Sequence, residues 1–166
     1  SSQPIDWYVL ALDRVLWSED ATDEASSATA LLHIDAAAMG REPDPLLMGL
    51  RAWVAAQAGL LDVRDATCRA LRVHWPDKTE TMRWDYITHA RNDPEAARAI
   101  ATARIARDPH CVAAWELLLG GMWRTKQLEQ GLALAEQARA VPVSSHLLDF
   151  YYGCLLIGNG RGDQGR

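Results

Sequence analysis

Residues 108–142 read DPHCVAAWELLLGGMWRTKQLEQGLALAEQARAVP, and they contain the clearest unit of a repeat that runs along much of the chain. Pro109 and Pro142 lie 33 residues apart in this stretch, and Pro43 and Pro76 precede them at the same interval. Proline fits the first turn of a helix but not its interior, so a turn is expected at each of the four positions. Recurrence at this period is typical of chains built from stacked helical hairpins.

Two further sets of residues follow the same interval. One set is aromatic or apolar, and the other is rich in residues that are common in turns. Because Gly and Asn tolerate the left-handed backbone conformation that closes a helix, each period predicts a helix, a turn and a second helix. The first set is Trp53, Tyr86, Leu119 and Tyr152, and the second set is Gly59, Asn92, Thr125 and Gly158.

Helix-capping signals divide the chain in the same way. Asp44-Pro45, Asp93-Pro94 and Asp108-Pro109 place a capping carboxylate before a first-turn proline, and Asp77 with Glu80 resembles a capping box. Helices are therefore expected to begin at these points. First helices are predicted at 45–58, 78–91, 110–124 and 144–157, second helices at 62–75, 94–107 and 127–140, and an N-terminal pair at 4–17 and 21–39.

Apolar residues recur at helical spacing inside the predicted second helices. Examples are the set Ala66, Ala70 and Val73 and the set Leu128, Leu132, Ala135 and Ala138. Alternation of β-branched and polar residues never extends over more than a few positions, so strands are not expected. The sequence predicts an all-α fold.

From Pro109 onward the chain resembles a tetratricopeptide repeat. The proline is followed by Trp115 six residues later and by Leu118 three beyond that, and residues 128–142 are similar to the family's second helix. The resemblance is close over residues 108–142 and extends by periodicity over residues 43–158. The family's small residue one place after the leucine is replaced here by Trp53, Tyr86, Leu119 and Tyr152, so wider spacing of the paired helices is expected.

The resemblance implies a right-handed α-solenoid of about four to five hairpins whose first helices line a concave groove. A single domain over residues 1–160 is expected, with an atypical helix pair at 1–42, repeats at 43–158 and a flexible tail at 159–166. Members of the family usually bind peptides or proteins rather than perform chemistry. The expected function is therefore that of a non-enzymatic adaptor, chaperone or regulatory module, whose partner is a protein or peptide segment.

The family's groove positions identify the residues expected to bind this partner. Arginine can bind a carboxylate through two hydrogen bonds and tryptophan supplies a large contact area, so the set favours an acidic or aromatic peptide. The alternative is that these side chains are ordinary solvated groups on helix faces. A clamp for a C-terminal carboxylate is not expected, because Ile87 stands where some family members have an asparagine. The candidates are Glu80, Arg83, Ile87, Arg91, Glu116, Trp123, Arg124, His146 and Asp149.

Aromatic residues give two further expectations. Of the seven tryptophans, Trp84 and Trp123 are expected to be partly exposed, because Trp53 and Trp115 fall on packing positions of the repeat. The last predicted helix, 144–157, is apolar on too many sides for a solvated terminal helix. This helix is expected to be covered by a second copy of the protein, by an additional helix of a longer native protein, or by the N-terminal helix pair. The interface residues expected on this helix are Phe150, Tyr151, Leu155 and Leu156.

Charge and motifs exclude several other classes. The net charge is −5, with no basic stripe for a nucleic acid, and no apolar run approaches the length of a membrane span. Cys68, Cys111 and Cys154 form neither a disulfide framework nor a metal-ligand spacing, which favours reduced thiols in the cytoplasm. No nucleotide-binding or hydrolase motif is present. No catalytic residue, metal ion or cofactor is therefore expected.

Two alternatives to an interaction module stay open. One is an all-helical enzyme whose pocket joins His89, His110 or His146 to a nearby carboxylate such as Asp85 or Asp149. The other is a structural subunit that forms homo-oligomers through residues 144–157. Within the interaction class, the size and acidic charge are similar to those of the tetratricopeptide chaperones of bacterial type III secretion.

Overall fold

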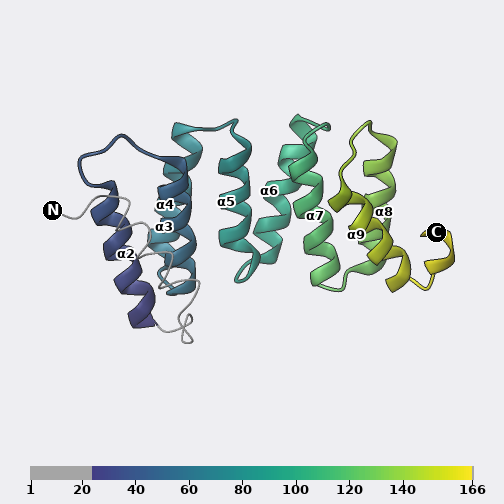
Figure 1. Ribbon diagram of the computed structural model, residues 1–166, viewed down its shortest axis with the longest axis horizontal. Coiled ribbons are helices and arrows are strands. Elements are labelled where there is room, and N and C mark those ends of the chain that lie inside the picture. The colour runs from purple at the N-terminus through teal and green to yellow at the C-terminus, as the bar shows by residue number, and fades with distance from the viewer. Residues whose placement is uncertain (1–23, 166) are drawn as a thin grey trace. The chain divides into compact units, whose positions relative to one another are not determined.

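The computed structural model describes residues 24–165, apart from the side chains of 24–26, 164 and 165. Eight α-helices follow one another in this range, without any strand between them (Figure 1). None of these helices is long and apolar enough to cross a membrane. The elements are α2 (Glu24–Ala38), α3 (Pro45–Gln57), α4 (Leu61–His74), α5 (Thr79–Ala90), α6 (Pro94–Arg107), α7 (Val112–Arg124), α8 (Leu128–Ala140), α9 (His146–Gly158) and the short 3-10 helix η1 (Gly162–Gly165).

The predicted all-α fold is confirmed over the described residues, and the helix bounds agree with the prediction to within two or three residues. The predicted helix at 4–17 lies outside the described residues. Apart from α2, whose start coincides with the first described residue, the largest shifts are the two residues at the starts of α7 and α9. Asp108 does not cap α7, because its side chain accepts a hydrogen bond from the His110 amide in the preceding turn, and Cys111 takes the capping position.

The repeat is visible in the helix boundaries. The helices α3, α5, α7 and α9 begin at residues 45, 79, 112 and 146, which are intervals of 33 or 34 residues. The four periodic prolines lie in the turns that precede these helices. Two of the predicted aspartate caps are also present, because Asp44 accepts hydrogen bonds from the amides of Leu46 and Leu47 and Asp93 accepts one from Ala96.

The turns that close the first helices differ from the prediction in detail. Gly59 adopts the left-handed conformation with φ 69°, as its position predicts. At the next closing turn Asn92 instead uses its side chain, which donates a hydrogen bond to the Ala56 carbonyl oxygen. Farther along, the left-handed residue is displaced to Lys126 with φ 60° and to Gly160 with φ 72°. The spacing therefore locates the turns but not the residue that reverses the backbone in each.

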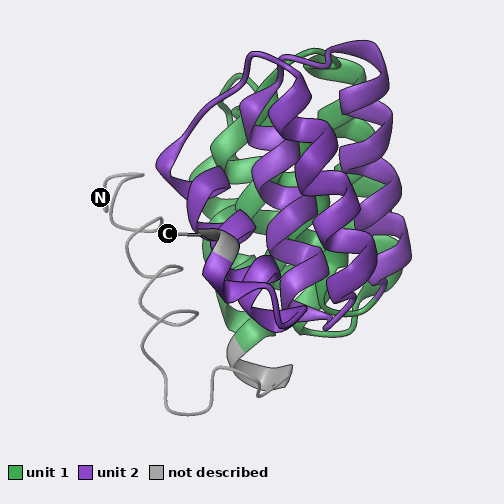
Figure 2. Cartoon of the chain, turned by 90° about the vertical axis from the view of Figure 1, so that its right-hand side faces the viewer, with its two compact units in different colours: residues 1–92 green, residues 93–166 purple. Residues whose placement is uncertain are grey.

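The chain divides into two compact units, residues 1–92 and 93–166 (Figure 2). The boundary falls in the turn between α5 and α6, which is inside a predicted period rather than between two periods.

In unit 1 the central helix is α3, which packs against α2, α4 and α5. Its close approach to α5 depends on Gly49, because a Cβ at this position would overlap three atoms of the Trp84 indole ring. The core of the unit consists of Ala30, Leu31, Ile34, Leu50, Val54 and Ala55, with Trp53, Val63 and Trp84 packed against it.

The buried face of α4 is not the one that the apolar pattern indicates. Ala66 and Val73 are exposed, and Val73 keeps 76% of its surface. The buried side chains of this helix are Arg64, Thr67, Cys68 and Leu71. Thr67 is satisfied in this position, because its hydroxyl donates to the Val63 carbonyl oxygen and accepts a hydrogen bond from Arg51.

In unit 2 the helix α7 packs against α6, α8 and α9, and α8 also packs against α9. Trp115 is buried and donates a hydrogen bond of 2.9 Å to the Pro109 carbonyl oxygen, which ties α7 to the turn before it. The stripe on α8 is confirmed as a packing face, since Leu132, Ala135 and Ala138 are buried. Within the tail expected at 159–166, residues 162–165 form η1, which contacts α9. Such neighbour contacts are those of stacked helical hairpins.

Candidate binding surface

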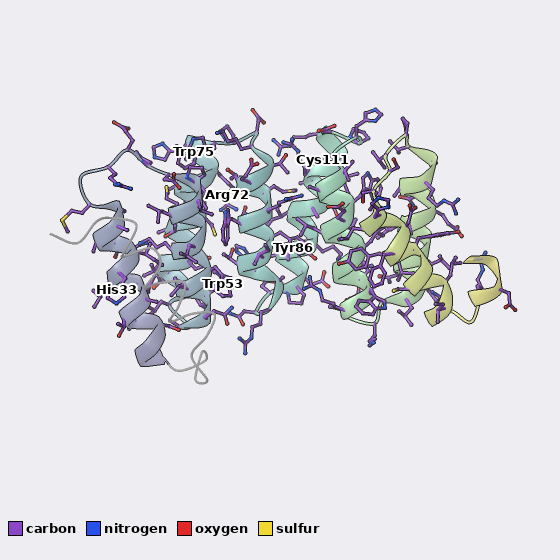
Figure 3. All side chains as sticks on the ribbon, in the orientation of Figure 1. His33, Trp53, Arg72, Trp75, Tyr86 and Cys111 are labelled. Carbon is purple, nitrogen blue, oxygen red and sulfur yellow. The ribbon has the colours of Figure 1, made fainter. Side chains whose placement is uncertain are left out.

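In unit 1 the expected partner-binding residues share one exposed stripe of α5. Glu80, Arg83, Ile87 and Arg91 are all exposed, at intervals of three or four residues, and Ile87 keeps 42% of its surface. The opposite side of α5 is buried and includes Tyr86, which is labelled in Figure 3. Arg91 is held at the end of the helix, because its guanidinium donates a hydrogen bond of 2.6 Å to the Gln57 side chain.

In unit 2 the polar candidates lie at the two ends of α7 and at the start of α9. Glu116 is half-buried and accepts a hydrogen bond of 2.7 Å from the Ser145 hydroxyl, which itself caps α9 by accepting from the Leu148 amide. Glu116 therefore connects α7 to the start of α9. Arg124 is exposed in the last turn of α7, where a cation is favoured by the helix dipole, and His146 and Asp149 are exposed in the first turn of α9.

Three aromatic side chains of α7 and α9 form one cluster, which we call the aromatic surface: Trp123, Phe150 and Tyr151. The ring centroids of Phe150 and Tyr151 are 5.5 Å apart, and Trp123 lies 6.4 Å from Phe150 in an edge-to-face arrangement. Phe150 keeps 57% of its surface exposed, and Trp123 and Tyr151 are partly exposed. Lys126 places its amine 5.6 Å from the Trp123 ring. An apolar platform with one cation, Lys126, at its border results.

Glycines in α7 and α9 shape this surface. A Cβ at Gly120 of α7 would lie 2.8 Å from the ring end and hydroxyl of Tyr151, so a larger residue there would require the Tyr151 ring to shift away from its present position. A Cβ at Gly153 of α9 would contact nothing within 4 Å. Gly120 therefore allows the present position of Tyr151, whereas Gly153 faces open space.

The expected interface residues of α9 divide into two groups. Phe150 and Tyr151 belong to the aromatic surface. Leu155 and Leu156 have no exposed surface at all, because α7 and α8 cover them in the core of unit 2. These two leucines therefore have no surface to offer a partner in this structure, and the apolar exposure of α9 comes instead from Leu147, Phe150 and Ile157.

Partial exposure was expected for Trp84 and Trp123, and both are partly exposed, but this does not set them apart from the other tryptophans. Trp84 and Trp123 are partly exposed, but so are Trp53 and Trp75, which are labelled in Figure 3. Trp7 and Trp17 lie outside the described residues. Only Trp115 of the described tryptophans is fully buried.

Among the histidines, His110 and His146 are exposed, whereas His89 is buried in unit 1. His89 lies beside Asp85, with Nδ1 3.6 Å from the carboxylate oxygen Oδ1. Around this pair a buried polar cluster forms, consisting of Cys68 from α4 and of Asp85, Thr88 and His89 from α5. Arg72 of α4, labelled in Figure 3, donates a hydrogen bond of 2.8 Å to the other carboxylate oxygen of Asp85.

Burial and charge affect the titrating groups of this region in opposite ways. Burial raises the pKa of the Cys68 thiol to about 11. The hydrogen bond from the Arg64 guanidinium lowers the pKa of Asp65, which lies at the edge of the cluster. The Cys68 thiol is therefore protonated at neutral pH.

Sequence reasoning considered Asp85 and His89 together but did not connect Cys68 with them. The sequence indicated only part of this cluster. Asp85 and His89 are four residues apart on one predicted helix, which places them on one face of it. Cys68 lies on a neighbouring helix, and its approach depends on how α4 packs. Comparison of the chain with models of known protein families, with curated proteins and with solved structures gave no match.

Proposed function

We propose that this chain is a non-enzymatic interaction module of the tetratricopeptide type. In this proposal the first helices α3, α5, α7 and α9 line a concave groove of a right-handed solenoid. Support comes from the regular starts of these helices and from the contacts between successive first helices, α3 with α5 in unit 1 and α7 with α9 in unit 2. Stacked helix pairs leave an extended surface that suits a chain-like ligand.

We propose further that the aromatic surface binds a peptide segment with an apolar or aromatic side chain and a neighbouring carboxylate. The observation that carries this proposal is the exposure of Phe150 beside Trp123, since exposed aromatic side chains are common among interface hot spots. Arg124 and Lys126, both exposed, would bind the carboxylate.

Selection from a random peptide library on the full chain tests the proposal. Enriched peptides should combine an aromatic or aliphatic residue with Asp or Glu. Trp123→Ala and Phe150→Ala should each weaken an enriched peptide by at least about tenfold, the loss typical of a central aromatic contact. Trp75→Ala, which removes a partly exposed tryptophan of unit 1, is the matched control and should leave the affinity unchanged. Equal affinity for the wild type and Trp123→Ala would reject the aromatic surface as the site.

A second candidate is self-association through α9. Leu147, Phe150 and Ile157 expose 48%, 57% and 70% of their surfaces on this helix, which is a large apolar exposure for one helix. Sedimentation over a wide range of concentration would reject this candidate if the chain stays monomeric. If a dimer forms, Ile157→Asp should dissociate it.

A further inference from the structure

Three buried side chains of unit 1 converge in an arrangement that the interaction function does not use. Cys68 offers a sulfur atom, Asp85 a carboxylate oxygen and His89 a ring nitrogen, and these three atoms all lie within 4.8 Å of one another. Asp85 is 3% exposed and His89 is 9% exposed, and Cys68 has no exposed surface. Ionisable groups are rarely buried together without a compensating partner.

The local structure explains how the three donors meet. Asp85 and His89 are four residues apart on α5, so they share one face of that helix. Cys68 lies on the buried face of α4, which packs against α5. The Thr88 hydroxyl lies between the two helices, 3.4 Å from the Cys68 sulfur, and also donates to the Asp85 carbonyl oxygen.

One oxygen of the cluster lacks a hydrogen bond. Asp85 Oδ2 accepts from Arg72, but Oδ1 is buried and has no hydrogen-bond partner. A buried carboxylate oxygen without a donor costs free energy, and the His89 Nδ1 atom lies 3.6 Å from it. Oδ1 is therefore a buried oxygen beside the His89 ring, with no hydrogen bond of its own.

We propose that Cys68, Asp85 and His89 bind a zinc ion. Zinc prefers thiolate, imidazole and carboxylate ligands, and these are the three donor types that meet here. Binding releases the thiol proton of Cys68 to solvent, so that the sulfur binds as a thiolate. The fourth coordination position is taken by water.

Neighbouring groups are arranged as they are around bound metal ions. Arg72 orients the Asp85 carboxylate through the oxygen that does not face the cluster. The His89 Nδ1 atom lies 3.6 Å from Asp85 Oδ1 and 2.7 Å from the Asp85 carbonyl oxygen, so Nδ1 is the ring nitrogen that the structure places beside the carboxylate, and backbone contact holds the ring in this orientation. Asp65 lies 3.9 Å from Nε2 and its side chain is 47% exposed, so the cluster lies close to solvent on this side.

Cobalt(II) is the probe that tests the assignment, because a cobalt–thiolate bond has an absorption band in the near ultraviolet. The full chain, freed of metal by a chelator, should develop this band and saturate at one equivalent of cobalt. Zinc should displace the cobalt and remove the band. Cys68→Ser should abolish it, and Asp85→Asn and His89→Gln should each weaken cobalt binding by more than about 100-fold, beyond the effect of residues that only orient a ligand.

A second variant keeps the test decisive if Cys68→Ser does not fold. The chain has three cysteines, so the double substitution Cys111→Ser with Cys154→Ser leaves Cys68 as the sole thiol. This variant must retain the band, and His110→Gln, which removes an exposed histidine, must bind cobalt as the wild type does. Absence of the band in the wild type at stoichiometric cobalt, or its loss in the double variant, would overturn the proposal.

Discussion

Replacement of Gly49 by alanine tests the contact between α3 and α5 that organises unit 1. In an exposed helix interior this change stabilises a protein by roughly 1 kcal/mol, because alanine has the higher helix propensity. At Gly49 the new Cβ would lie closer than 3.0 Å to three atoms of the Trp84 indole ring. These atoms are next to the Trp84 Cβ, so the ring cannot avoid the overlap by moving its far end.

The overlap is expected to dominate the helix propensity. Relief requires a shift of α5 relative to α3 or a new rotamer of Trp84, and overpacking of this kind typically costs about 1–3 kcal/mol. Because the overlap extends over the ring itself, we expect a cost near the top of that range. Gly49→Ala should therefore destabilise unit 1 by about 2 kcal/mol after the gain in propensity is subtracted.

Urea denaturation followed by circular dichroism and tryptophan fluorescence measures the effect. Gly153→Ala is the matched control, because Gly153 also lies inside a helix but a Cβ there would contact nothing within 4 Å. The control should stabilise the protein by about 0.5–1 kcal/mol. The two substitutions are thus predicted to change the free energy of unfolding in opposite directions.

A double-mutant cycle with Trp84→Ala separates the overlap from other causes. Without the indole ring, Gly49→Ala should become neutral or stabilising. An equal destabilisation in the presence and absence of the ring would refute the reasoning, as would a stabilising effect of Gly49→Ala in the wild type.

Three further predictions concern other parts of the chain. Asn159→Ala should destabilise unit 2 by about 1–2 kcal/mol in thermal unfolding, because the side chain donates hydrogen bonds to the carbonyl oxygens of Leu128 and Leu155. Iodoacetamide at pH 8 should modify the partly exposed Cys154 well before Cys68, whose burial raises its pKa to about 11; peptide mass mapping reads this order. Faster modification of Cys68 would contradict it. The lowered pKa of Asp65, caused by the hydrogen bond from Arg64, stabilises the fold above the ordinary carboxyl pKa and ceases to do so as the pH falls through the lowered value. Asp65→Asn should therefore lower the free energy of unfolding by less than about 1 kcal/mol at neutral pH, since the group is half-exposed. In acid the variant and the wild type should have the same free energy of unfolding.

The positions of the helices could be predicted because the signals for them are local. A proline excludes itself from a helix interior whatever surrounds it, and Asp44 and Asp93 cap the helices that follow them through bonds that span three residues at most. The predicted start of α7 is two residues too early. An aspartate at position 108 can either cap a helix or stabilise the turn before it, and the sequence does not decide between these two roles.

The buried faces could be predicted only where apolar residues mark them. The stripe on α8 met this condition, but on α4 the buried face includes Arg64 and Thr67 while Val73 is exposed. Polar side chains can be buried when neighbouring helices provide hydrogen bonds, and the sequence pattern does not contain those neighbours.

The candidate sites depend on contacts between helices to a still greater degree. The leucines at 155 and 156 were expected at an interface, but both are fully buried in α9, which packs against α7 and α8, and Leu155 lies where a Cβ at Gly131 of α8 would be. Phe150 keeps 57% of its surface exposed, although Trp123 of α7 lies against its ring.

What could be read from the order of residues alone was a succession of helices with a regular period, because turn formation and capping involve residues near one another in the chain. Which side chains meet across that succession was settled by packing. Cys68 is 17 positions from Asp85, and it reaches the carboxylate because α4 and α5 bury their facing sides together, an outcome that depends on the shapes of many side chains at once.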